Sequence, residues 1–203
     1  MKQLLLPLAA AVLAAAGSAA ASPVVPTGPE HRLNAQEIRD LAKRELLWCD
    51  DFHAQNGSCE AVTLITLAPD GRLAETTTLL LSEGPRLQAF IGEVDVVDGD
   101  RVCSKVAAST LPIAFTLEGH SVPADAANGL RDAVVSSLAE LDGKTICQTF
   151  YRGADPNQLR EEVTVDGKRR KDLETVYRLH DGKDGFDLRP QVKDTDGGQG
   201  IKA

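Results

Sequence analysis

The sequence contains few aromatic residues and a single methionine. Phe, Trp and Tyr together make up 4% of the 203 residues, and there is one Trp. A core of ordinary size must therefore rest on Leu, Val, Ile and Ala. This is feasible because 42% of the residues are hydrophobic.

An excess of positive charge is also missing, since the formal net charge is −8 at pH 7. Nucleic acid and anionic membrane surfaces are bound through a cationic surface, so we expect neither as a partner. The negative charge is compatible with a neutral or a basic partner and does not distinguish between them.

The only long apolar run lies at the N-terminus. Lys2 precedes an apolar stretch at residues 4–16, and Ala19-Ala20-Ala21 follows with the small-residue pattern that a signal peptidase cleaves. We expect residues 1–21 to be a signal peptide, and no later run has the length of a membrane helix. The sequence therefore predicts an exported protein, periplasmic or secreted, that does not span a membrane.

No recognisable catalytic motif is present. A glycine-flanked nucleophilic serine is absent, and His31, His53, His120 and His180 are scattered along the chain. We interpret all four as surface histidines and expect no catalytic residue and no cofactor. Because a triad assembles in space and not in sequence, a small hydrolase using His53 or His120 with a nearby acid remains the alternative.

The four cysteines predict two disulfides, since export exposes thiols to an oxidising compartment. Three pairings are possible. We prefer Cys49–Cys59, which closes a short polar loop, and Cys103–Cys147, which ties two strands on either side of a helix.

The loop between Cys49 and Cys59 also offers two thiols and the imidazole of His53 to a soft metal. The spacing is not a standard zinc pattern and a fourth ligand is missing, so we expect no metal site. On this interpretation Asp50 and Asp51 lie in a solvated loop.

The hydrophobic periodicity predicts two main helices, at residues 34–48 and 123–141. Asn34 and Glu37 have the spacing of a capping box at the start of the first helix, and Trp48 at its end is expected to anchor the core. Hairpins fill the rest of the domain, with strands expected at residues 61–68, 73–81, 86–97, 101–106, 144–152, 159–165 and 168–179.

The fold class is therefore α+β, a hairpin-rich antiparallel sheet with two main helices packed on it. We expect an extended arm at residues 22–32, a single domain at 33–190 and a disordered tail at 191–203. The alternative is a pseudo-repeat of two helix-plus-curved-sheet units in a cystatin-like arrangement, at residues 33–118 and 119–190.

One hairpin turn decides where a cysteine points. If Asp98 and Gly99 form a two-residue turn, Val94 faces Cys103 across the strand pair, and Cys103 points to the core.

Three charged motifs have simple structural interpretations. The basic run at residues 168–171 is expected to be a solvated hairpin tip, with docking of an anionic partner as the alternative. Glu161 and Glu162 alternate along a strand and should point to opposite faces. The acid-glycine stretches at 181–185 and 194–197 lack the ligand spacing of a calcium loop and are interpreted as turns and tail.

Taken together, these features favour an exported, disulfide-stabilised, non-catalytic binding or interaction module of the bacterial envelope. Its expected partner is a protein or a small apolar ligand, held on a concave sheet face or a hairpin edge. An envelope hydrolase and a purely structural envelope protein are the alternatives. The sequence leaves the oligomeric state open.

Overall fold

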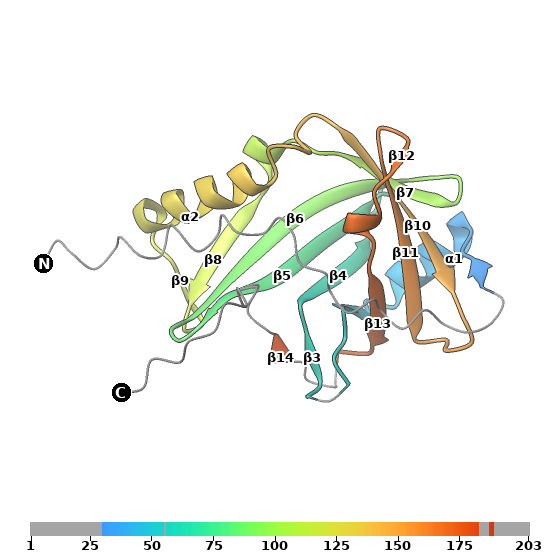
Figure 1. Ribbon diagram of the computed structural model, residues 1–203, viewed down its shortest axis with the longest axis horizontal. Helices are drawn as coiled ribbons and strands as arrows, with labels where there is room; N and C mark the ends of the chain where they lie inside the picture. Colours follow the sequence, from blue (N-terminus) through green and yellow to red (C-terminus); the bar gives the residue numbers. More distant parts are fainter. Residues whose placement is uncertain (1–29, 55, 183–186, 189–203) are drawn as a thin grey trace, which may run out of the picture.

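The computed structural model describes residues 30–54, 56–182 and 187–188 (Figure 1). The expected signal peptide, the expected tail and most of the expected arm lie outside these residues. So do residues 183–185 of the first acid-glycine stretch and all of the second, at 194–197.

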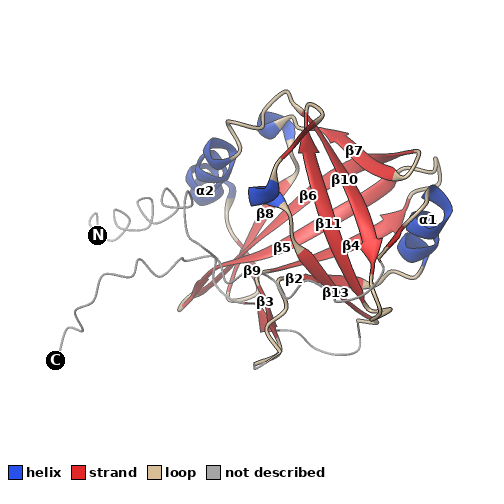
Figure 2. Ribbon diagram, turned by 45° about the vertical axis from the view of Figure 1, so that its right-hand side comes forward, coloured by secondary structure: helices blue, strands red, loops and turns tan. Residues whose placement is uncertain are grey.

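The central feature is an antiparallel sheet that closes on itself (Figure 2). In the part of the chain described, the ring runs in the order β10, β11, β13, β2, β4, β5, β6, β7 and back to β10. Its strands are β2 (Leu47–Asp50), β4 (Ala61–Leu67), β5 (Leu73–Glu83), β6 (Arg86–Asp98), β7 (Arg101–Lys105), β10 (Thr145–Arg152), β11 (Gln158–Val165) and β13 (Val176–His180).

Shorter elements extend this ring. Strand β8 continues the sheet beside β6, β9 pairs with β8, β1 pairs with β10, and β12 pairs with β11. A separate parallel pair joins β3 to β14. The bounds are β1 (His31–Arg32), β3 (Ser58–Cys59), β8 (Ile113–Leu117), β9 (His120–Ser121), β12 (Lys168–Arg169), β14 (Asp187–Leu188), and the 3₁₀ turns η3 (Ala108–Thr110) and η4 (Lys171–Leu173).

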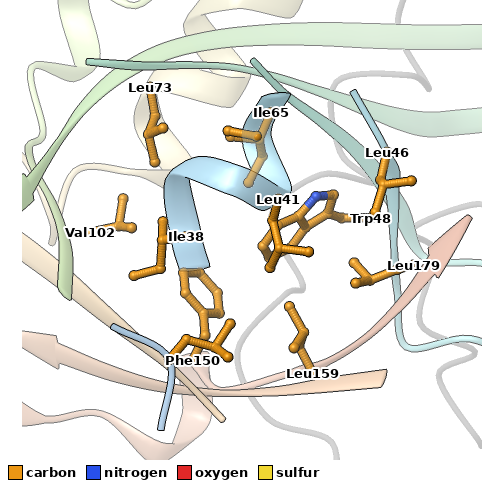
Figure 3. Close-up of a cluster of buried hydrophobic side chains, with 12 residues drawn as sticks. Ile38, Leu41, Leu46, Trp48, Ile65, Leu73, Val102, Phe150, Leu159 and Leu179 are labelled. Atoms are coloured by element: carbon orange, nitrogen blue, oxygen red, sulfur yellow. The ribbon is translucent and has the colours of Figure 1, made fainter. Parts of the chain in front are cut away.

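Helix α1 (Ala35–Lys43) packs its apolar face into one end of the closed sheet (Figure 3). The predicted capping box is confirmed: Asn34 Oδ1 accepts from the backbone N–H of Glu37, whose side chain accepts from the backbone N–H of Asn34. The predicted end of this helix is wrong. Arg44 forms the C-cap and Glu45 has a φ of +50°, so the chain leaves the helix and enters β2, which carries Trp48.

The apolar cluster around α1 is well packed. Trp48 is 2% exposed, and its ring centroid lies 5.3 Å from that of Phe150 and 5.4 Å from that of Tyr177, with edge-to-face geometry. Trp48 therefore anchors the core, as the sequence predicts. The buried members are Leu33, Ile38, Leu41, Ala42, Leu46, Trp48, Ile65, Leu73, Val102, Phe150, Leu159 and Leu179.

Helix α2 (Ala124–Ser137) lies at the other end of the molecule from α1 (Figure 1, Figure 2). It covers the inner face of the sheet where the long strands β5 and β6 extend beyond the ring and β6 pairs with β8. Arg131 fixes the helix to the chain before β8 by donating to the backbone oxygens of Ser109, at 3.0 Å, and Leu111, at 2.8 Å.

These observations confirm the α+β class, with a mainly antiparallel sheet and two helices. The finer cystatin-like expectation is not confirmed. Most hairpins form as predicted, but the expected strand at residues 168–179 is interrupted by η4, because the chain turns after β12 before it enters β13.

The predicted register at Cys103 is wrong. Asp98 pairs with Arg101, so the turn residues are Gly99 and Asp100, and Cys103 faces Val96 and not Val94. Since Val102 belongs to the buried cluster, its neighbour Cys103 points to the outer face.

The structure pairs Cys49 with Cys59 and Cys103 with Cys147, which is the connectivity preferred from the sequence. Cys103 and Cys147 are direct partners on β7 and β10. These two strands make the contact that closes the ring, so the second disulfide fastens the closure.

Candidate functional site

A layer of polar side chains lies inside the closed sheet, next to the apolar cluster around α1. Alternate residues of a strand point to the same face, so the residue two positions from a buried cluster member also points inward. On six strands of the ring one such residue is polar, and on β6 and β13 the polar residue lies two positions from Val97 and Tyr177, which are partly buried against the same cluster. We call the layer the polar belt: Asp50, Thr63, Glu75, Asp95, Ser104, Gln148, Glu161 and, just before β13, Thr175.

Cross-strand register supports this placement. Asp95 pairs with the buried Leu73, and Glu161 pairs with the buried Phe150. Partner residues on adjacent antiparallel strands share a face, so both carboxyl groups point into the ring.

The belt lies between the two apolar clusters. On β6 the inward residue after Asp95 is Glu93, and the next is Ile91, which packs under α2. On β5 the same order runs from Glu75 through Thr77 to Leu79, which also belongs to the α2 cluster. The inner face thus changes from apolar at α1, to acidic and polar, to apolar again at α2.

Glu75 and Asp95 are neighbouring acids whose carboxyl groups influence each other's pKa. Burial raises the pKa of both, and for Glu75 the negative charge of Asp95 raises it further. Burial also raises the pKa of the neighbouring Glu93, although a hydrogen bond from Ser104 opposes this shift.

Glu161 is 2% exposed, and its Oε2 accepts from the Tyr177 hydroxyl at 3.3 Å. Burial raises the pKa of Glu161 well above its ordinary value, and the charge of Asp50 adds to this. The pKa of the Tyr177 hydroxyl is raised for the same reasons, burial first and then the charge of Glu161. A neutral, protonated Glu161 is therefore the favoured form in the folded state.

Asp50 does not lie in a solvated loop, so that interpretation is wrong. It is the last residue of β2, it pairs with Tyr177 and Ala61, and Thr175 Oγ1 donates to its carboxylate. Burial raises its pKa to about 7. Asp51, next in the chain, has a φ of +42° and lies beyond the strand.

No cation balances these carboxyl groups within the described residues. The belt contains no Lys, Arg or His, and no ion pair reaches its acids. Three buried polar atoms of this interior have no hydrogen-bond partner within the described chain: Glu75 Oε1, Glu161 Oε1 and Trp48 Nε1. Since buried polar groups are normally paired, the interior has hydrogen-bonding capacity that the protein itself does not use.

Thr63, Asp95 and Glu161 of the belt are buried, and the other belt members are half-buried, as are Glu93, Thr77, Leu79 and Ile91 toward α2. The half-buried acids Glu75 and Glu93 are therefore continuous with half-buried apolar residues under α2.

The histidines considered from the sequence lie on separate elements. His31 is in β1, His53 in the loop after β2, His120 in β9 and His180 in β13. His31 contacts Glu37 at 2.9 Å on the exposed surface. None of the four belongs to the polar belt, so the structure does not place the predicted His53 or His120 with the buried acids.

The other charged motifs lie on the outside. Both arginines of the basic run, Arg169 and Arg170, form ion pairs with nearby acids, as a solvated hairpin tip would. Their partners are Glu162 and Glu174 for Arg169, and Glu140 and Asp172 for Arg170. Glu161 and Glu162 point to opposite faces, as predicted, since Glu162 pairs with Arg160 at 2.9 Å on the outer face.

Within the described residues, no group of three or more His, Cys, Asp and Glu side chains has the geometry to hold a metal ion. In the same residues no helix has the length and apolar character needed to cross a membrane. Comparison with protein families, with curated proteins and with solved structures finds no match.

Sequence reasoning missed most of the belt, and one signal was available. Glu161 occupies the same alternation as Leu159, Val163 and Val165, which are all buried, so the pattern of β11 places a carboxyl group on the core face. The acids of β5 and β6 carry a weaker signal, because polar residues also occupy the other face of those strands.

Proposed function

We propose that this protein is an exported, non-catalytic binding module that holds a small apolar ligand on the inner face of its sheet, beneath α2. The packing under α2 carries the proposal. Three members of that cluster are buried, namely Ala89, Phe115 and Val134, whereas eight apolar residues packed against them stay only partly buried in the described structure.

The cluster around α1 gives the contrast. There twelve apolar residues are buried and three are partly buried. A helix that serves only to cover a sheet is expected to pack as α1 does, because buried apolar area is the main source of stability. The partly buried apolar area under α2 is area that a ligand can cover.

Export is supported by the two disulfides, which are typical of proteins in oxidising compartments. The structure closes the sheet into a ring, so the accessible part of the inner face is the extension formed by β5, β6 and β8. The cystatin-like two-unit origin stays a prediction, and the binding proposal does not depend on it.

The test uses N-phenyl-1-naphthylamine, an uncharged apolar dye whose emission rises in apolar surroundings. We expect saturable binding to the wild-type protein. Leu130→Glu, on the sheet side of α2, should weaken binding by roughly tenfold or more, since it replaces a contact of 1.5–3 kcal/mol with a charge. The control Ser136→Glu places the same charge at an exposed position of the same helix and should bind as the wild type does.

A second variant on the sheet side, Ile113→Glu, changes β8 and not α2. Weaker binding by this variant therefore cannot be explained by unfolding of α2 caused by a substitution within the helix. Thermal unfolding of each variant shows whether the closed sheet remains folded. The proposal is overturned if the wild type shows no saturable binding, or if both sheet-side variants bind the dye as tightly as the wild type does.

A further inference from the structure

We propose that the bound molecule is a cationic amphiphile, with its apolar part beneath α2 and its amine or ammonium group against the carboxyl groups of the polar belt at Glu75 and Asp95. This inference rests on the proposed function, because it takes the α2 end as the entry to the site.

The first argument is the composition of the belt. Four of its residues are carboxylic acids, Asp50, Glu75, Asp95 and Glu161, and Glu93 adds a fifth acid on the side toward α2. Burying even one ionised carboxylate without a partner costs several kcal/mol, so in the absence of a cation these groups must keep protons. A ligand cation would stabilise the ionised form, so the carboxyl group beside it would release its proton to solvent when the ligand binds.

The second argument is the unused hydrogen-bonding capacity. Glu161 is 2% exposed and points into the ring, yet its Oε1 has no partner in the described structure. Glu75 Oε1 is likewise buried without a partner, although the residue as a whole is half-buried. A carboxyl group can accept hydrogen bonds in its protonated form and accepts at both oxygens once ionised, so N–H donors of a ligand would satisfy these atoms.

The third argument is continuity along two neighbouring strands. On β6, Ile91 lies under α2, and Glu93 and Asp95 follow on the same face. With a rise of about 3.3 Å per residue, the distance from Ile91 to Asp95 along the strand is about 13 Å. Strand β5 shows the same succession from Leu79 to Glu75, and the two acids Glu75 and Glu93 are direct partners.

The charge is better matched by an organic amine than by a metal ion. In the residues that the structure describes, no three acids or histidines form a group that could hold a metal. An ammonium group needs fewer ligands, because its N–H groups can donate to two or three separate acceptors. The apolar part of such a molecule would then cover the apolar surface under α2, which a metal ion alone would leave uncovered.

The test compares three ligands that share one chain length and differ in charge: decylammonium, decan-1-ol and decanoate, each used below its micelle concentration. Affinities come from displacement of N-phenyl-1-naphthylamine from the wild-type protein. A hydrogen bond that involves a charged group is worth about 1.5–3 kcal/mol, so decylammonium should bind roughly tenfold or more tightly than decan-1-ol. Decanoate should bind most weakly.

Two variants locate the charged group. Glu75→Gln and Asp95→Asn keep the side-chain size, and each should remove most of the preference for decylammonium over decan-1-ol. The control Glu162→Gln changes a carboxylate on the outer face and should keep the wild-type preference.

The outcomes separate the two proposals. If all three ligands fail to bind, the proposed function is wrong and this inference falls with it. If decan-1-ol binds and decylammonium binds no more tightly, the proposal of an apolar binding site is kept and the proposal of a cationic ligand is refuted. If decylammonium is preferred equally by the wild type, Glu75→Gln and Asp95→Asn, the charged group does not lie at the belt and the inference is overturned.

Discussion

Replacing Glu161 with glutamine should make the stability of the protein less dependent on pH. Glu161 is buried inside the closed sheet, where no residue that the structure describes supplies a cation, and burial raises the pKa of its carboxyl group well above 4.5. Glutamine has almost the same shape and no charge, so Glu161→Gln removes this titration and leaves an oxygen that can accept from Tyr177.

The sign and size of the effect follow from proton linkage. Below pH 4.5 both the folded and the unfolded chain hold the proton, so Glu161 makes little difference. Above that pH the unfolded chain releases the proton and the folded protein keeps it, so the free energy of unfolding falls as the pH rises. Each pH unit costs about 1.4 kcal/mol until the pH reaches the raised pKa.

The measurement is urea unfolding of the wild type and of Glu161→Gln at pH values from 4 to 8. Between pH 5 and 7 we expect the wild type to lose up to about 3 kcal/mol more than Glu161→Gln does. The control Glu162→Gln changes the ion pair with Arg160 on the outer face and should keep the wild-type slope. Parallel curves for the wild type and Glu161→Gln would refute the claim that this carboxyl group is buried and protonated.

Three further predictions test the framework of the fold by chemical unfolding. Replacing Cys103 and Cys147 with serine should cost about 4 kcal/mol, because the bond closes a loop with a sequence separation of 44; a loss below 1 kcal/mol would show that it does not fasten the ring. Asn34→Ala should lower stability by about 1 kcal/mol and Asn34→Ser by much less, since serine also caps helices; equal losses would argue against the capping box. Leu41→Ala should cost about 2–5 kcal/mol, whereas Leu117→Ala, 42% exposed, should cost about 0.5 kcal/mol or less; similar values would contradict the assigned core.

The sequence predicts those parts of the fold that depend on short-range patterns. The cap at Asn34 and the turn at residues 166–167 are specified by residues that are neighbours in the chain, and both are found. The end of α1 is decided by tertiary structure, because Trp48 has a partner on β4 and another on β13 that a local pattern does not contain.

The polar belt is harder to predict because its members come from eight different segments of the chain. Closure depends on β7 pairing with both β6 and β10, which lie far apart in the sequence. Val94 and Val96 are alternate residues of β6 and both are exposed, so Cys103 points outward whichever of the two it faces. Asp50 is hard to assign to the belt from the sequence because of its chemical type. A charged residue near a disulfide loop is normally solvated, and only the pairing of β2 with β13 shows that its carboxyl group points inward.

The central claim is that the acidic interior receives the charged group of a ligand that enters under α2. The most direct measurement is a crystal structure of the protein with decylammonium bound. The account predicts density for the alkyl chain between α2 and β6, with the amine nitrogen within hydrogen-bonding distance of Glu75 or Asp95. Density only on the outer face, for example at Val94 and Val96, which are 51% and 52% exposed, would contradict it.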